Sequence, residues 1–377
     1  MVNFSFNKHI ILTGAVFAGI ISGTPGCSSN SSTATGDGTV TAVTLGRKIF
    51  FDENLSSNAN QSCASCHSPI SGFADPRVLK TSPVSEGSVS GAFGNRNAPT
   101  SAYASFSPDF RLTTTAQTSE DPSKYEGGQF YDGRSLDLIE QAKAPFLNPV
   151  EMNNTDEADV VNKVQNSSYA DDVRTVYGET AFDNINTAYT NIATALAAFE
   201  GSSEMNPFTS KFDAFMNDPV NNPLSDSERR GFNLFKDPNG AKCANCHTLD
   251  VSGNTPSLFT NFKYYNIGVP ANPDNPNNAQ DLGLGAVTLE TDQEGKFKVP
   301  TLRNIELTPP YMHNGVHATL EDVVRHYDLF GDGNIFADVN RNIASELNPG
   351  AETSMGLTPV NYIDLVAFMK TLTDGYF

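Results

Sequence analysis

The pattern of apolar and polar positions predicts short amphipathic helices separated by loops. Two similar segments, Leu45–Asp52 and Arg230–Asp237, both place apolar residues on one helical face. The second is preceded by Ser225, with Glu228 three residues on, which is the pattern of a capping box. Alternating strand patterns are few, so we predict a mostly α-helical fold. Further helical patterns occur at 156–165, 186–200, 319–330 and 359–372.

Two positions indicate where helices begin and where the chain divides. Thr358 before Pro359 is a good pair for the cap and the first residue of the last helix. The helical patterns are interrupted between residues 200 and 225, around Gly201–Ser203 and Asn221–Pro223. Because the chain has 377 residues, two domains are more plausible than one. We therefore expect domains at 41–205 and 206–377.

The N-terminus has the pattern of an export signal. Lys8 and His9 precede an apolar run, Ile10–Ile21, that is too short to span a membrane. The run is followed by Cys27, which resembles the lipidated first residue of a bacterial lipoprotein. We expect a signal peptide at 1–26 and a flexible Ser/Thr/Gly-rich tether at 27–40, with ordinary cleavage to a free protein as the alternative. The expected location is the periplasm, with a lipid on Cys27 as the one membrane anchor.

The charge of the chain is strongly negative. With 43 acidic and 24 basic residues the net charge is −19. This balance argues against nucleic acid as a partner, because phosphates require basic side chains. It is compatible with electrostatic attraction to a basic partner protein, although it also serves simple solubility.

Two pentapeptides carry the decisive chemistry. Cys63–His67 (CASCH) and Cys243–His247 (CANCH) both have the C-x-x-C-H spacing of c-type haem attachment. The two thiols form thioethers to the haem vinyl groups, and the adjacent histidine becomes an axial iron ligand. Disulfides would not explain the histidines, a thioredoxin-like dithiol would come once, and zinc would require the two pairs to be closer in sequence. We therefore expect two covalent c-type haems.

The ligand on the side of each iron opposite the motif histidine decides function. No histidine lies between His67 and His247, so the first iron is expected to have an open or water-occupied position. The alternatives are a methionine (Met152, Met205 or Met216) or a histidine from the second domain. Spacing alone does not choose the second iron's ligand. The candidates are Met312, His313, His317, His326, Tyr327, Met355 and Met369.

Most of the chain from about residue 40 resembles the bacterial di-haem cytochrome c peroxidase superfamily. The resemblance implies two cytochrome-c-like domains, each with one haem, and hydrogen peroxide as oxidant. The matching segments are RNAPT at 96–100, QFYDGR at 129–134, NPVEM at 148–152, FKVPTLRN at 297–304, PYMHNG at 310–315 and TLE at 319–321.

The resemblance also implies the second iron's ligand. Classical members carry a methionine where this chain has Tyr327. This is similar to the MauG-type branch, in which tyrosine ligates the second haem and the first haem lacks a distal histidine. A hard phenolate oxygen would stabilise the higher oxidation states of iron. The alternative is that Tyr327 is a half-buried helix aromatic and His326 is the ligand.

Further site residues follow from the resemblance. Glu151 and Gln141 match the polar residues above the first iron, where Glu151 would move the peroxide proton and Gln141 would hydrogen-bond the oxygen. Pro145 matches a residue that lines the same pocket. Asn97, Thr308 and Pro310 match the ligands of a calcium ion between the haems.

One departure from the family concerns electron transfer. The family usually has a tryptophan between the haems, whereas this chain contains none and has Tyr131 at that position. The chain is expected to form a high-valent iron state at the first haem and to share the oxidising equivalents with the second through Tyr131. The electrons would come from a small cytochrome c or copper protein. The alternatives are oxidation of tryptophan or another side chain on a partner protein, and a non-catalytic electron carrier.

Overall fold

The structure is a computed structural model that describes residues 39–113, 123–249, 256–329 and 355–376. The predicted signal peptide, Cys27 and all but the end of the tether lie outside these ranges. Residues 40–377 form one compact unit. None of the helices in the described ranges is long and apolar enough to cross a membrane.

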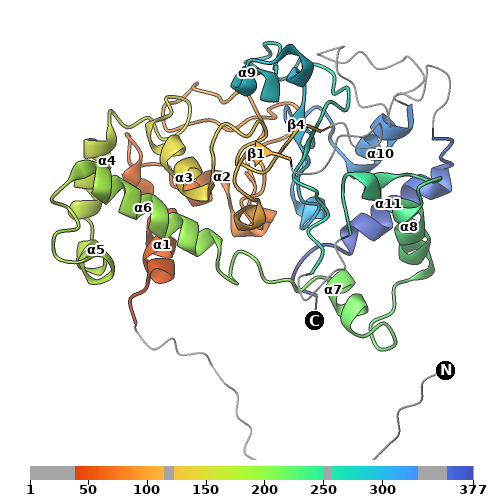
Figure 1. Ribbon diagram of the computed structural model, residues 1–377, viewed down its shortest axis with the longest axis horizontal. Helices are drawn as coiled ribbons and strands as arrows, with labels where there is room; N and C mark the ends of the chain where they lie inside the picture. Colours follow the sequence, from red (N-terminus) through yellow and green to blue (C-terminus); the bar gives the residue numbers. More distant parts are fainter. Residues whose placement is uncertain (1–38, 114–122, 250–255, 330–354, 377) are drawn as a thin grey trace, which may run out of the picture. The chain divides into compact units, whose positions relative to one another are not determined.

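Helices dominate the described chain, as the sequence predicts (Figure 1). The strands are two-residue segments that pair antiparallel, β1 (Arg111–Leu112) with β2 (Tyr125–Glu126) and β3 (Tyr264–Tyr265) with β4 (Phe297–Lys298). The α-helices are α1 (Ala42–Phe50), α2 (Cys63–Cys66), α3 (Leu138–Leu147), α4 (Glu157–Gln165), α5 (Ala170–Tyr177), α6 (Ile185–Glu200), α7 (Lys211–Asn217), α8 (Asp226–Lys236), α9 (Leu284–Thr288), α10 (Leu320–Leu329) and α11 (Pro359–Lys370). The 3₁₀ turns are η1 (Glu53–Leu55), η2 (Pro69–Ser71), η3 (Ala104–Phe106), η4 (Cys243–Asn245), η5 (Thr291–Gln293) and η6 (Ile305–Leu307).

The predicted helix starts are confirmed by their caps. The Ser225 hydroxyl accepts from the backbone N–H of Glu228, whose carboxylate accepts from the backbone N–H of Ser225. The Thr358 hydroxyl likewise accepts from the N–H of Asn361 at the start of α11. Helices α1, α4, α6, α8, α10 and α11 occur where the patterns predict them, whereas α2, α3, α5, α7 and α9 were not predicted.

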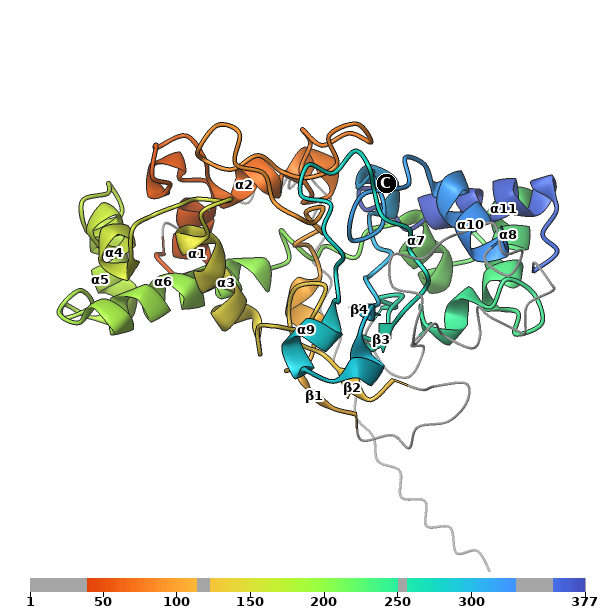
Figure 2. The same ribbon diagram turned by 90° about the horizontal axis from the view of Figure 1, so that it is seen from above.

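Two hydrophobic cores lie on either side of the predicted domain boundary. The buried residues of the first come from between Leu45 and Met205, and those of the second from between Phe212 and Leu372. Figure 2 shows α8, α10 and α11 gathered together, apart from α4, α5 and α6. Since residues 40–377 form one compact unit, the division into domains at 41–205 and 206–377 stays a prediction.

The same helix crossing occurs once in each core. Helix α1 packs on α6, and α8 packs on α11, with a glycine at each contact. A Cβ atom added to Gly46 would lie 1.8 Å from the Ala195 carbonyl oxygen, and one added to Gly231 would lie 1.9 Å from the Asp364 carbonyl oxygen. Each crossing therefore requires glycine for the close approach of two backbones.

Replacing Gly46 with alanine should destabilise the protein by roughly 1–3 kcal/mol, because the α1–α6 contact must open. The matched control is Gly94→Ala, since a Cβ there would meet no atom closer than 3.7 Å. Chemical denaturation of both variants measures the difference. Equal stability of the two would contradict the close contact.

Candidate functional site: two histidine–cysteine centres

The two motif histidines are held in the same way. His67 Nδ1 lies 3.1 Å from the Phe73 carbonyl oxygen, and His247 Nδ1 lies 2.8 Å from the Phe259 carbonyl oxygen. A carbonyl only accepts, so Nδ1 carries the proton and Nε2 keeps its lone pair. Burial lowers the pKa of both imidazoles, that of His247 to about 4. Both are therefore neutral and oriented as iron ligands usually are.

A threonine hydroxyl forms a hydrogen bond to the loop that contacts each motif histidine. Thr100 donates its hydroxyl to the Gly72 carbonyl at 2.6 Å, and Thr301 donates to the Leu258 carbonyl at 2.7 Å. Gly72 and Leu258 each directly precede the residue whose carbonyl binds the motif histidine. The duplication therefore extends beyond the motifs to the segments RNAPT and FKVPTLRN.

The four motif cysteines are partly buried thiols and are not joined in disulfides. Burial raises the pKa of Cys63, Cys66 and Cys243. Among the described residues, no three His, Cys, Asp or Glu side chains gather as a metal site would require.

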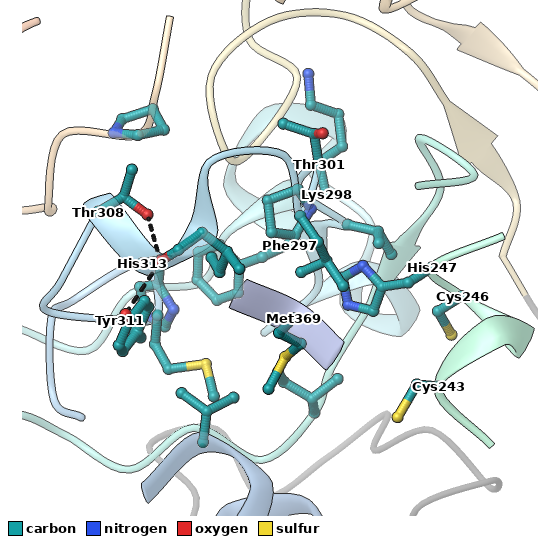
Figure 3. Close-up of a pocket in the computed structure, with 18 of the residues that line it drawn as sticks. Cys243, Cys246, His247, Phe297, Lys298, Thr301, Thr308, Tyr311, His313 and Met369 are labelled. Carbon is teal, nitrogen blue, oxygen red and sulfur yellow. Dashed lines mark hydrogen bonds between the residues drawn. The ribbon is translucent and has the colours of Figure 1, made fainter. Parts of the chain in front are cut away.

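A cavity of about 300 Å³ adjoins the second motif (Figure 3). Cys243, Cys246 and His247 line it, together with Tyr327 from α10 and Met369 from α11. His326 is not among the lining residues, and its Nε2 lies 2.8 Å from the Ile267 carbonyl oxygen. The structure thus brings Tyr327, and not His326, to the cavity that borders His247.

Other predicted residues line the same cavity. Tyr131 is one, as are the three predicted calcium ligands Asn97, Thr308 and Pro310. The Asn97 amide donates to the Pro83 carbonyl at 2.8 Å, and the Thr308 hydroxyl donates to a backbone carbonyl at 3.3 Å. The three thus line one cavity, and a calcium ion bound by them stays a prediction.

Lys298 is a lining residue that sequence reasoning missed. Its amine donates to the Gly128 carbonyl and to the Ser107 hydroxyl, and burial lowers its pKa to about 7. Its backbone N–H donates to the Tyr131 carbonyl at 2.7 Å. A lysine amine in an apolar cavity is suited to pair with a carboxylate, which would favour its charged form. The one sequence signal was a lysine inside the apolar segment 297–302.

Comparison with known proteins decides the family. The family model for di-haem cytochrome c peroxidases matches residues 40–221. The methylamine utilization protein MauG of Paracoccus denitrificans is 36% identical over 357 residues, covering 88% of each chain. A cytochrome c551 peroxidase of Nitrosomonas europaea is 32% identical over 340 residues, covering 87% of this chain and 79% of its own. The crystal structure of the di-haem peroxidase BthA of Burkholderia thailandensis has a TM-score of 0.79 at 32% identity, covering 88% of this chain and 86% of its own.

The chain belongs to the di-haem cytochrome c peroxidase family. It is therefore a di-haem oxidoreductase that depends on peroxide, related to MauG and to the bacterial cytochrome c peroxidases. The family implies two haems, and the two histidine–cysteine centres provide the residues for them.

In this di-haem peroxidase, Glu151 lies close to the first motif. Burial raises the pKa of its carboxyl, against the opposing effects of Arg134 and the Asn148 side chain. The Glu151 carboxyl in turn raises the pKa of both Cys63 and Cys66. Its backbone is fixed by hydrogen bonds from its N–H to Asn148 and from the Ser88 N–H to its carbonyl.

Helix α3 supplies the other two predicted residues of the first centre. Gln141 and Pro145 lie on this helix, just before the turn that carries Glu151. The helix begins at Asp137, whose carboxylate accepts from the N–H of Glu140. Its interior proline explains why no helix was predicted there, since proline removes one helical hydrogen bond.

Helix α3 and helix α10 occupy corresponding places. Helix α3 packs on α6 as α10 packs on α11. The cap of α10 is Thr319, whose hydroxyl accepts from the N–H of Asp322, as Asp137 caps α3. Pro145 and Tyr327 each stand eight residues after their cap. The position of Tyr327 in the second centre is thus taken by a residue without a donor atom in the first.

Of the other candidate ligands of the second iron, Met312, His313, Met355 and Met369 line the same cavity as Tyr327, whereas His317 does not. The choice of Tyr327 among them therefore stays a prediction from the family resemblance. Met216 is 49% exposed, whereas Met152 and Met205 are buried in the first core. His313 stacks on Phe297 with ring centroids 3.7 Å apart. His317 packs against His326 at 5.0 Å. The histidines weighed as ligands of the first iron are thus found beside the second motif, where His313 lines the cavity and His317 packs against His326.

Proposed function

We propose that the chain uses hydrogen peroxide to oxidise a partner, at a first haem bound covalently by Cys63 and Cys66 and ligated by His67. The second haem would be attached to Cys243 and Cys246 and ligated by His247 and Tyr327. The observation that carries this proposal is the correspondence of Pro145 with Tyr327. It would give one centre two protein ligands and leave the other a free position for peroxide.

The haem irons, when bound, would supply the redox chemistry. The protein residues would move protons and hold the reactants. The Glu151 carboxylate would accept the proton of the peroxide oxygen nearer the iron and return it to the leaving oxygen. The Gln141 amide would donate a hydrogen bond that holds the oxidant in place.

Tyr327 would bind as a phenolate. An anionic oxygen ligand favours the higher oxidation states of iron, so the second centre would store an oxidising equivalent. Tyr131 lines the second cavity and would relay that equivalent between the centres. Burial raises the pKa of the Tyr131 phenol, and the charge of Arg96 lowers it. Calcium at Asn97, Thr308 and Pro310 would hold the segments between the centres together.

Two kinds of partner fit the chemistry. A small cytochrome c or copper protein would be the reductant if the chain removes peroxide. A side chain of a partner protein would be oxidised instead if the chain acts like MauG, and the tyrosine at 327 favours this second reading. Steady-state oxidation of reduced cytochrome c by peroxide separates the two. The periplasm, with or without a lipid on Cys27, is the proposed location.

The EPR spectrum of the oxidised protein tests the asymmetry of the centres. We expect one high-spin ferric signal, from the centre of His67, and one low-spin signal, from the centre of His247 and Tyr327. Two low-spin signals, with no spectral response to peroxide, would leave only an electron carrier.

A further inference from the structure

The repeated helix crossing relates Glu200, a buried carboxyl of the first core, to a residue of the second centre. Gly46 meets Ala195 and Phe199 of α6, and Gly231 meets Asp364 and Phe368 of α11 at nearly the same distances. The next residue of α6 is Glu200, and the next residue of α11 is Met369. Since Met369 lines the second haem cavity, Glu200 occupies the corresponding place at the first centre.

The surroundings of Glu200 agree with this placement. Its exposed fraction is 7%, the same as that of Met369. Burial has the largest effect on the pKa of the Cys63 thiol, and the Glu200 carboxyl has the next largest. Both raise this pKa. Cys63 is the first attachment residue of the first centre. A carboxyl therefore lies against the first motif, at the place where the second centre has the side chain of Met369.

We propose that Glu200 is a second buried carboxyl of the first haem centre, which takes up a proton when the iron of that haem is reduced and releases it on oxidation. The inference rests on the proposed function, because it requires a haem at Cys63 and His67. In the step, a small cytochrome c or copper protein would supply one electron to the haem held by Cys63, Cys66 and His67, and the Glu200 carboxylate would take up one proton from solvent. No net charge is then added to the buried site.

Glu200 is one of two buried carboxyls, with Glu151, that act on the first motif. Burial raises its pKa to about 8. Glu151 also raises the pKa of the Cys63 thiol, and the Cys63 thiol in turn raises the pKa of the Tyr169 phenol. The charged side chains on the helices packed against α6 are engaged at the surface. They form the ion pairs Arg47–Glu204, Lys48–Asp172, Lys143–Glu140 and Lys163–Asp159. Glu157 raises the pKa of the Tyr189 phenol.

The sign of the expected effect follows from linkage. Reduction lowers the positive charge at the iron, so it favours the protonated carboxyl. The reduction potential of the first haem should therefore fall as the pH rises through the range around 8. This dependence would keep the first iron easier to reduce at low pH than at high pH.

The test is a spectroelectrochemical titration of the intact di-haem protein across a pH range centred near 8. Glu200→Gln keeps the shape of the side chain but carries no exchangeable charge, and it should lose the fall in potential of the high-spin haem over this range. Glu200→Met introduces the residue of the corresponding position and should behave likewise. The matched control, Glu179→Gln, removes an exposed carboxylate and should follow the wild type.

The outcomes separate this inference from the proposed function. A wild-type pH dependence in both Glu200 variants would overturn the role of Glu200 while leaving the two haems in place. An equal loss in Glu179→Gln would also overturn it, since the effect would then be one of overall charge. Lack of a high-spin haem in the wild type would instead refute the proposed open centre.

Discussion

Replacing Glu151 with glutamine should slow the reaction of the oxidised protein with peroxide by roughly a hundred-fold or more. Glutamine has nearly the same shape but accepts no proton, so the peroxide oxygen would keep its proton at the step where it must lose it. The rate of the spectral change after rapid mixing with peroxide measures the effect. A wild-type rate would exclude Glu151 as the proton carrier.

The pH dependence gives a second test of Glu151. Burial raises the pKa of this carboxyl, and only the carboxylate form accepts a proton. The wild-type rate should therefore decline as the pH falls through this raised pKa, and the decline should be absent in Glu151→Gln. The matched control is Glu140→Gln, which removes a half-exposed carboxylate of α3 that pairs with Lys143. It should leave both the rate and its pH dependence unchanged.

The features that the sequence predicted are local ones. The two C-x-x-C-H motifs are contiguous, and the caps at Ser225 and Thr358 depend on residues three positions apart. Such signals do not require knowledge of the tertiary structure. The family resemblance added Tyr327, and the structure brings this residue to the cavity beside His247.

The features that the sequence missed depend on packing. Helix α3 was not predicted, because Pro145 interrupts its pattern and its packing against α6 outweighs that penalty. The correspondence of Pro145 with Tyr327 becomes visible only once both helix caps are known. The cavity position of Lys298 and the burial of Glu200 were not predicted, since both are properties of the folded chain. An alignment of the two glycine-containing helix pairs would have been the one signal for Glu200.

Replacing Tyr327 with phenylalanine should abolish the response of the second haem to peroxide. The variant keeps the aromatic ring in the cavity but removes the oxygen that would bind the iron. Without this anionic ligand, the second centre loses the stabilisation of its higher oxidation state, while the first centre should still react. Rapid-mixing spectra and the low-spin EPR signal report on the two haems separately.

The matched variant for Tyr327→Phe is His326→Gln, because the neighbouring histidine is the competing ligand. The Nε2 atom of His326 faces the Ile267 carbonyl, and its ring lies edge-on to that of Tyr327 at 5.7 Å. Its replacement should therefore leave the axial ligand and the peroxide response intact. If His326→Gln changed the low-spin signal and Tyr327→Phe did not, histidine would be the ligand. The second centre would then be an ordinary electron-transfer haem, and the argument for oxidation of a partner protein would lose its chemical basis.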